Sequence, residues 1–139
     1  MVSWAVLSVL VFHTNKTLWA GWVVEAPEQK MFFAGDTGYS QDSKDIGERF
    51  GIMDISLIPI GAYAPRWFMQ DMHVNPDEAV QIHQDVQSRF SVGMHWGTFL
   101  NLTDEPLLEP SQRLKEVLTE RKLSQESFIT LKHGQTLRL

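Results

Sequence analysis

The chain has 139 residues, of which 43% are hydrophobic and 21% charged, and its formal net charge is −5 at pH 7. These values are typical of one globular domain, and they argue against a disordered chain or a basic nucleic-acid surface. The sequence contains no cysteine, which excludes disulfides, thiol nucleophiles and cysteine-based zinc sites. Any metal must therefore bind to histidine, aspartate or glutamate.

The N-terminal segment, residues 1–13, opens with an almost wholly apolar run over residues 1–12. The run is too short to span a bilayer, and it has neither the basic start nor the small-residue cleavage site of a signal peptide. A buried strand or a helix packed under the domain is the favoured interpretation, since an exposed run would be an adhesive surface. We therefore predict a single domain over residues 1–139 and a cytoplasmic location.

Hydrophobic periodicity divides the rest of the chain into strands and helices. Strands are predicted at residues 17–25, 30–34, 54–60, 90–96, 127–132 and 136–139, and helices at 42–50, from Asn75 and from Glu109. A proline turn makes the first two strands a hairpin. A long loop, residues 61–72, precedes the second helix, and the last two strands flank a turn at His133 and Gly134.

The second helix carries the strongest start signals. Asn75 can cap its first turn, Pro76 suits its first position, and two acidic residues face the positive end of the helix dipole. Its apolar stripe consists of Ala79, Ile82, His83 and Val86. His83 is therefore interpreted as a packed structural histidine.

The order of these elements predicts a layered α/β (α+β) fold. Strands and helices alternate in the middle of the chain, with strand pairs at the ends. We expect a mixed sheet with helices on one face. In such sheets, the groups that do chemistry gather in the loops that leave the carboxyl ends of the strands.

Three polar side chains lie at or near such strand ends. Asp36 follows the second predicted strand, His95 lies at the end of the fourth, and His73 comes just before the second helix. A carboxylate and two imidazoles can converge on one ion, and they suit zinc, iron or manganese. The structural alternatives are that Asp36 caps the helix near Ser40 or forms an Asx turn, and that His95 is a hydrogen-bonded core residue.

The triplet Asp-Thr-Gly at residues 36–38 has a rival interpretation. It is also the catalytic triplet of aspartic proteases, in which two such aspartates share one proton. That fold is nearly all β, whereas this chain has three well-signalled helices. The rival is therefore weak.

The long loop supplies the candidate substrate-binding residues Tyr63, Arg66 and Trp67. Arg66 can meet an anionic group such as a phosphate, and its alternative is a surface salt bridge. Trp67, Phe68 and Met69 can line an apolar groove for acyl chains. Their alternative is core packing, which is the more common fate of such residues.

Five segments in order resemble a known family. They are Leu-Trp-Ala-Gly-Trp at 18–22, Phe-Phe-Ala-Gly-Asp-Thr-Gly-Tyr at 32–39, Ile-Pro-Ile-Gly-Ala-Tyr at 58–63 with Pro-Arg-Trp-Phe-Met at 65–69, His-Val-Asn-Pro-Asp-Glu-Ala-Val at 73–80, and His-Trp-Gly-Thr-Phe at 95–99. This set is similar to N-acylphosphatidylethanolamine phospholipase D and its bacterial relatives, which are hydrolases of the metallo-β-lactamase fold. The resemblance covers residue 14 to the C-terminus.

The resemblance implies an αββα sandwich with a two-zinc site that hydrolyses a lipid phosphodiester. It places Asp36 as the residue that bridges both metals, His95 as a ligand of the second metal, and His73 in the active site near the scissile phosphate. Asp36 and His73 are thus the implied catalytic residues. Two cations would hold a hydroxide and the phosphate for an in-line displacement.

Two features of the family are missing from this sequence. The chain has no His-x-His-x-Asp-His motif, and His13 does not match the later His-Trp ligand. The resemblance therefore implies a truncated, C-terminal half of the fold with an incomplete zinc site, because such sites usually have three or four ligands. The alternative is a catalytically inactive fragment or a binding module.

Half a sandwich leaves a face of its sheet uncovered. We expect a homo-oligomer, or a partner that supplies the N-terminal half, and a stable monomer on size exclusion would contradict this. Peripheral membrane contact is expected only through a lipid substrate, and no nucleic-acid partner is expected.

Overall fold

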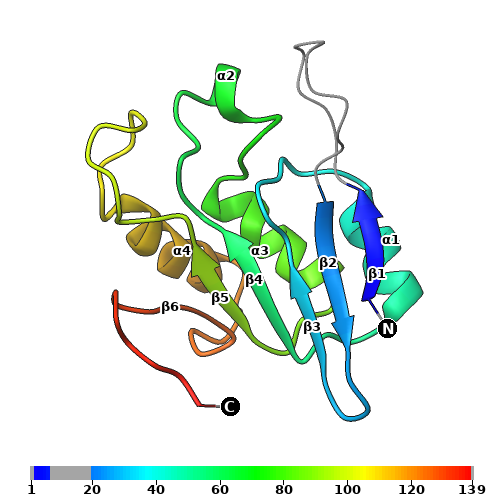
Figure 1. The fold of residues 1–139 in the computed structure, drawn as a ribbon. Helices are drawn as coiled ribbons and strands as arrows, with labels where there is room; N and C mark the ends of the chain where they lie inside the picture. The colour runs from blue at the N-terminus through cyan, green and yellow to red at the C-terminus, as the bar shows by residue number, and fades with distance from the viewer. Residues whose placement is uncertain (1, 7–19, 139) are drawn as a thin grey trace.

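The computed structural model describes residues 2–6 and 20–138, and it places them around one six-stranded sheet (Figure 1). The strands lie side by side in chain order: β1 (Val2–Val6), β2 (Ala20–Glu25), β3 (Lys30–Phe33), β4 (Ile55–Pro59), β5 (Ser91–Met94) and β6 (Phe128–Thr130). The first three strands are antiparallel, and β3 to β6 are parallel. The predicted mixed sheet and its first hairpin are confirmed. The beginning of the first predicted strand lies outside the described residues.

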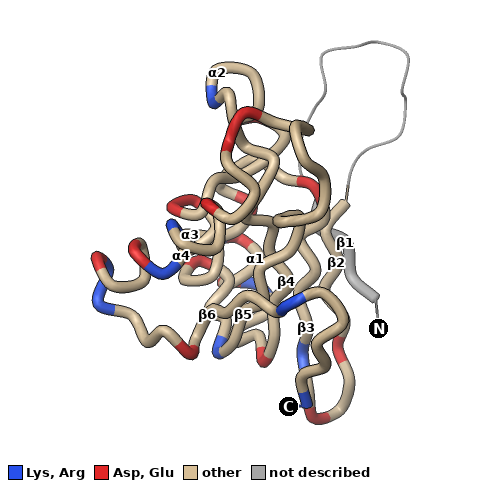
Figure 2. Tube along the Cα trace, turned by 90° about the vertical axis from the view of Figure 1, so that its left-hand side faces the viewer, with Lys and Arg blue, Asp and Glu red and all other residues tan. Residues whose placement is uncertain are grey.

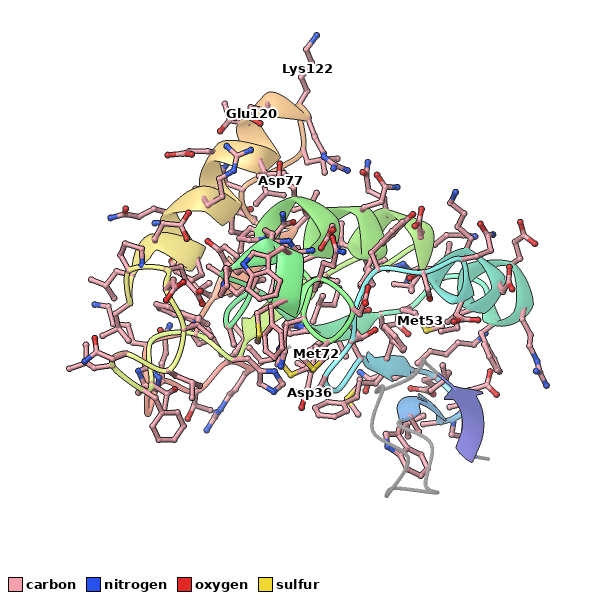
Figure 3. All side chains as sticks on the ribbon, turned by 90° about the horizontal axis from the view of Figure 1, so that it is seen from above. Asp36, Met53, Met72, Asp77, Glu120 and Lys122 are labelled. Atoms are coloured by element: carbon pink, nitrogen blue, oxygen red, sulfur yellow. The ribbon has the colours of Figure 1, made fainter. Side chains whose placement is uncertain are left out.

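Helices cover one face of this sheet, as predicted. They are α1 (Asp42–Phe50), α3 (Pro76–Asp85) and α4 (Glu109–Glu120), and α3 packs on β4 and between the other two. The view from above in Figure 3 shows them on the same side of the strands. A fourth, one-turn helix, α2 (Arg66–Met69), stands in the loop that rises above the sheet (Figure 1).

The two faces of the sheet differ in burial because side chains alternate along each strand. Phe32, Ile58 and Phe128 point toward the helices and are fully buried in the core. On the other face, Leu57 pairs with Phe33 on one side and with Val92 on the other, and all three side chains are only partly buried. This second face is thus apolar and is not covered by any described helix. The association expected from the sequence remains a prediction.

The N-terminus of α3 forms the cap that its sequence predicts. The Asn75 side chain accepts a hydrogen bond from the Glu78 backbone at 2.9 Å, and the Glu78 carboxylate accepts one from the Asn75 backbone at 3.0 Å. Such a cap stabilises a helix by about 1 kcal/mol. It fixes the point at which the chain leaves His73, two residues before the cap, and enters the helix.

His83 is a buried structural residue, as predicted. Its Nδ1 lies 2.8 Å from the Ser91 hydroxyl, its ring contacts Phe128, and burial lowers its pKa below the ordinary value of 6.5.

This histidine makes stability depend on pH. A buried neutral histidine stabilises the fold fully above about pH 6.5, and this stability is lost as the pH falls toward its lowered pKa. We expect the unfolding free energy in urea to be lower at about pH 5 than at about pH 7.5. The dependence should be shallower in His83→Gln, which does not titrate and keeps a polar group that can hydrogen-bond to Ser91. Equal slopes in the two proteins would contradict this.

Helix α4 carries charges of both signs (Figure 2). Arg113 on this helix binds Asp77 of α3 at 2.7 Å, and this pair joins the two helices. Within α4, Arg113 also binds Glu120 at 2.9 Å. Among the described residues, no helix combines the length and apolarity needed to cross a membrane.

Two parts of the expected fold differ from the structure. The loop 61–72 contains α2, because the Pro65 carbonyl accepts hydrogen bonds from the backbone of Phe68 and Met69 and so closes one helical turn. The strand expected at 136–139 does not form over residues 136–138. These residues are exposed and include a single large apolar side chain, Leu137, so they have little apolar surface to bury by pairing.

Candidate metal centre

The carboxyl ends of β3 and β5 place two of the candidate ligands. Asp36 follows β3 after Gly35, whose φ of 68° turns the chain sharply, and His95 directly follows β5 with a φ of 60°. Because β3, β4 and β5 are parallel, their carboxyl ends share one edge of the sheet. A left-handed conformation is costly for a non-glycine residue, and such strain is concentrated at functional sites. Asp36 is labelled in Figure 3.

Asp36, His73 and His95 come together in space. Asp36 Oδ1 lies 3.2 Å from His95 Nδ1, and the ring centroids of the two histidines are 6.2 Å apart. One ligand atom from each of the three residues lies within 4.8 Å of the other two. A carboxylate and two imidazoles at these separations form a donor set suited to zinc. The structure thus brings together the three residues that the sequence suggested, while their roles remain predictions.

His73 is held by its backbone. Its N–H donates to the Met69 carbonyl at 2.8 Å, and its own carbonyl accepts from Arg66 Nη1 at 2.7 Å. Its Nδ1 is buried and has no hydrogen-bond partner among the described residues. A buried ring nitrogen without a partner is costly unless a ligand or water binds it, so this atom also fits a metal centre.

The electrostatic surroundings favour the neutral form of His73. Burial lowers its pKa below 6.5, and the neighbouring His95 acts in the same direction. The carboxylates of Asp36 and Glu105 oppose this shift. A neutral imidazole can bind a metal or accept a proton at neutral pH.

Two of the structural alternatives are wrong: Asp36 is not a helix cap, and His95 is not a core residue. Helix α1 has Gln41 at its N-cap position and no side-chain cap, so Asp36 does not cap it. The His95 side chain is 35% exposed and faces Asp36, which is not the environment of a core histidine.

The three residues open into a cavity of about 550 Å³. Its wall comes from the loops after β3, β4 and β5. The other lining residues are Gly61, Ala62, Met69, Trp96, Gly97, Thr98, Phe99, Leu102, Thr103, Glu105, Pro106, Leu107 and Pro110. Most of them are apolar, so the cavity joins a polar ligand cluster to an apolar wall, as sites for small molecules usually do.

The predicted substrate-binding residues do not line this cavity. Arg66 is engaged with both carboxylate oxygens of Glu78 at 2.9 Å. Trp67 is 79% exposed and Phe68 56% exposed, so core packing is wrong for both. Tyr63 is buried, and within the described part of the chain its hydroxyl has no hydrogen-bond partner. Binding by Tyr63, Arg66 or Trp67 remains a prediction.

Two residues near the cavity were not singled out from the sequence as site residues. Glu105 lines the cavity and binds backbone amides of the loop after β4. His133, expected only as a turn residue, has its ring 6.0 Å from that of Trp96 and its Nε2 3.3 Å from the Thr98 hydroxyl. Both contacts join segments far apart in the chain, so no local pattern signals them.

Comparison with known proteins identifies relatives of the chain. A phospholipase of Caenorhabditis elegans, "N-acyl-phosphatidylethanolamine-hydrolyzing phospholipase D 1", is 47% identical over 123 residues, which are 87% of this chain and 35% of the relative. The mitochondrial enzyme of the same description from Saccharomyces cerevisiae is 41% identical over 120 residues, 84% of this chain and 25% of the relative. The chain thus spans about a third or less of these relatives' length.

A solved structure and a sequence profile identify the fold and the family of the chain. The structure resembles that of Igni18, a metallo hydrolase from the archaeon Ignicoccus hospitalis, with a TM-score of 0.66 and 20% identity over 98% of this chain and 52% of that one. The metallo-β-lactamase fold is confirmed, and the aspartic protease alternative is wrong. The sequence profile of the "Beta-lactamase superfamily domain" matches residues 5–96. This match covers more than half of the chain, and the chain therefore belongs to the β-lactamase superfamily.

Proposed function

We propose that the chain carries part of the site of a zinc-dependent phosphodiesterase that acts on lipids such as N-acylphosphatidylethanolamine. The observation that carries the proposal is the convergence of Asp36, His73 and His95 at the mouth of an apolar cavity. The likeness to two enzymes described as hydrolysing this lipid supports the substrate class.

In this proposal the three residues have different tasks. Asp36 and His95 would hold zinc, which when bound polarises a phosphoryl oxygen and makes water a stronger nucleophile. His73, neutral because of its burial, accepts a proton beside the scissile phosphate. The Arg66 contact to the His73 carbonyl keeps this imidazole in place.

The apolar wall supports a lipid substrate over a small polar one. Phe99 and Leu102 line the cavity while remaining 70% and 65% exposed, so they present apolar surface at its mouth. Trp67 and Phe68 on α2 are also exposed. Side chains of this kind suit acyl chains and contact with a lipid surface, where aromatic residues are favoured.

One observation favours a second candidate, a binding module without activity. The described residues bring together only three metal-ligand atoms, whereas a two-metal site needs more. In that case the chain binds zinc, or a partner that completes the site, and does not hydrolyse lipid alone.

Zinc titration and lipid hydrolysis separate the two candidates. For the phosphodiesterase we expect bound zinc and release of N-acylethanolamine from N-acylphosphatidylethanolamine vesicles, abolished by a chelator and restored by zinc. Loss of hydrolysis with retained zinc binding is expected for His73→Gln. Zinc binding without hydrolysis by the parent chain supports the binding module. Absence of zinc binding contradicts the phosphodiesterase and leaves only a module that binds a completing partner.

A further inference from the structure

We propose that Glu105 is a positioning residue of the metal centre: its carboxylate holds the turn 61–64 against the peptide of His95. The inference rests on the proposed function only in treating His95 as a metal ligand. In the proposed function, neither Glu105 nor the turn 61–64 binds the metal or acts as a nucleophile.

The carboxylate of Glu105 binds three consecutive backbone amides. Ala62 and Tyr63 donate to its Oε1 at 2.6 and 3.3 Å, and Ala64 donates to its Oε2 at 3.0 Å. The Thr103 hydroxyl also donates to Oε1, at 2.8 Å. Charge-assisted hydrogen bonds of this kind are stronger than bonds between neutral groups. Glu105 therefore ties the loop after β4 to the loop after β5.

The turn that Glu105 holds contains a residue in a strained backbone conformation. Ala62 has a φ of 62°, in the left-handed region that favours glycine. Its N–H and those of the next two residues point to one place, which is an arrangement that binds an anion. Without the carboxylate, three amides would lose their partner and the turn would lose the contact that offsets its strain.

The first residue of the same turn, Gly61, lies close to the backbone of His95. A Cβ added at Gly61 would collide with the His95 carbonyl oxygen and would lie 3.1 Å from the Trp96 Cα. Just before it, the Ile60 N–H donates to the Met94 carbonyl at 3.0 Å. His95 itself adopts a φ of 60°, so its peptide needs support from outside its own strand. Gly61, the first residue of the turn 61–64, lies against it, and Glu105 binds the next three residues of the turn.

The first test follows backbone amide chemical shifts without metal. In Glu105→Gln, the neutral amide cannot accept from all three backbone donors. We expect the amide signals of Gly61 and His95 to move, together with those of residues 62–64. The matched control is Asp104→Asn, which removes the same charge from the adjacent, exposed side chain and should leave Gly61 and His95 unchanged. Shifts confined to residues 62–64 in Glu105→Gln would overturn the proposal.

The second test measures zinc affinity by calorimetry. We expect Glu105→Gln to bind zinc about 10- to 100-fold more weakly than the parent, which is the effect of losing a residue that orients a ligand. Asp104→Asn should match the parent. If the parent binds no zinc, the proposed function fails, while the amide shifts still decide the role of Glu105. Unchanged affinity in Glu105→Gln overturns the positioning role.

A milder variant covers the outcome in which Glu105→Gln does not fold. Thr103→Val removes one hydrogen bond to the same carboxylate and keeps the three amide contacts. We expect it to move the Gly61 and His95 amide signals away from their positions in the parent protein. No movement of either signal in a folded Thr103→Val, with Glu105→Gln unfolded, would assign Glu105 to stability alone.

Discussion

Replacing Asp36 by asparagine is expected to weaken zinc binding by at least about 100-fold, because even residues that only orient ligands change affinity 10- to 100-fold. Asp36 supplies the one carboxylate of the described cluster, and a neutral amide does not offset the charge of a divalent cation. The change also replaces the carboxylate whose Oδ1 lies 3.2 Å from His95 Nδ1 by a neutral amide, so the imidazole loses a negatively charged neighbour. Calorimetric titration with zinc measures the effect.

The fold itself should tolerate Asp36→Asn. The side chain of Asp36 is 57% exposed, so its replacement should change the unfolding free energy by no more than about 0.5 kcal/mol. Asp71→Asn is the control, since it neutralises an exposed carboxylate in the loop before His73. It should bind zinc like the parent. Equal zinc affinity in Asp36→Asn and Asp71→Asn would remove Asp36 from the metal centre.

The convergence of Asp36 and His95 was predictable because it follows from strand direction. His95 directly follows β5, and Asp36 follows β3 with two residues between them. Both strands have a clear apolar pattern, and parallel strands end at the same edge. The position of His73 was predictable for a related reason, because the cap at Asn75 fixes where the loop ends and helix α3 begins. Local signals were sufficient wherever backbone geometry placed the side chain.

The parts of the site that were not predictable depend on contacts between distant segments. Glu105 binds amides 41 to 43 residues away, and its own neighbourhood shows no periodicity or motif that indicates this. The sequence does not decide between a groove and the core for Trp67 and Phe68, because α2 spans one turn, which is too short for an apolar stripe to show which side faces solvent. The Arg66 contact to Glu78 likewise depends on the position of α3 relative to the loop.

The contact between Gly61 and the peptide of His95 joins the stability of the fold to the metal centre. An added methyl group at Gly61 would meet the His95 carbonyl and the Trp96 Cα, which are backbone atoms that cannot move aside by changing rotamer. Overpacking of this kind costs about 3 kcal/mol when the neighbours are rigid. Relief would have to come from separating the loop after β4 from His95.

We therefore expect Gly61→Ala to lower the unfolding free energy by about 3 kcal/mol and to weaken zinc binding at the same time. Gly134→Ala is the control for the added methyl group alone: its φ is 81° but nothing lies near its Cβ position, so it should cost about 1 kcal/mol and leave zinc affinity unchanged. Denaturant unfolding and zinc titration measure the two effects. If Gly61→Ala were destabilised but bound zinc like the parent, the backbone contact would support the fold without positioning His95. Glu105 could then not position His95 through the turn 61–64.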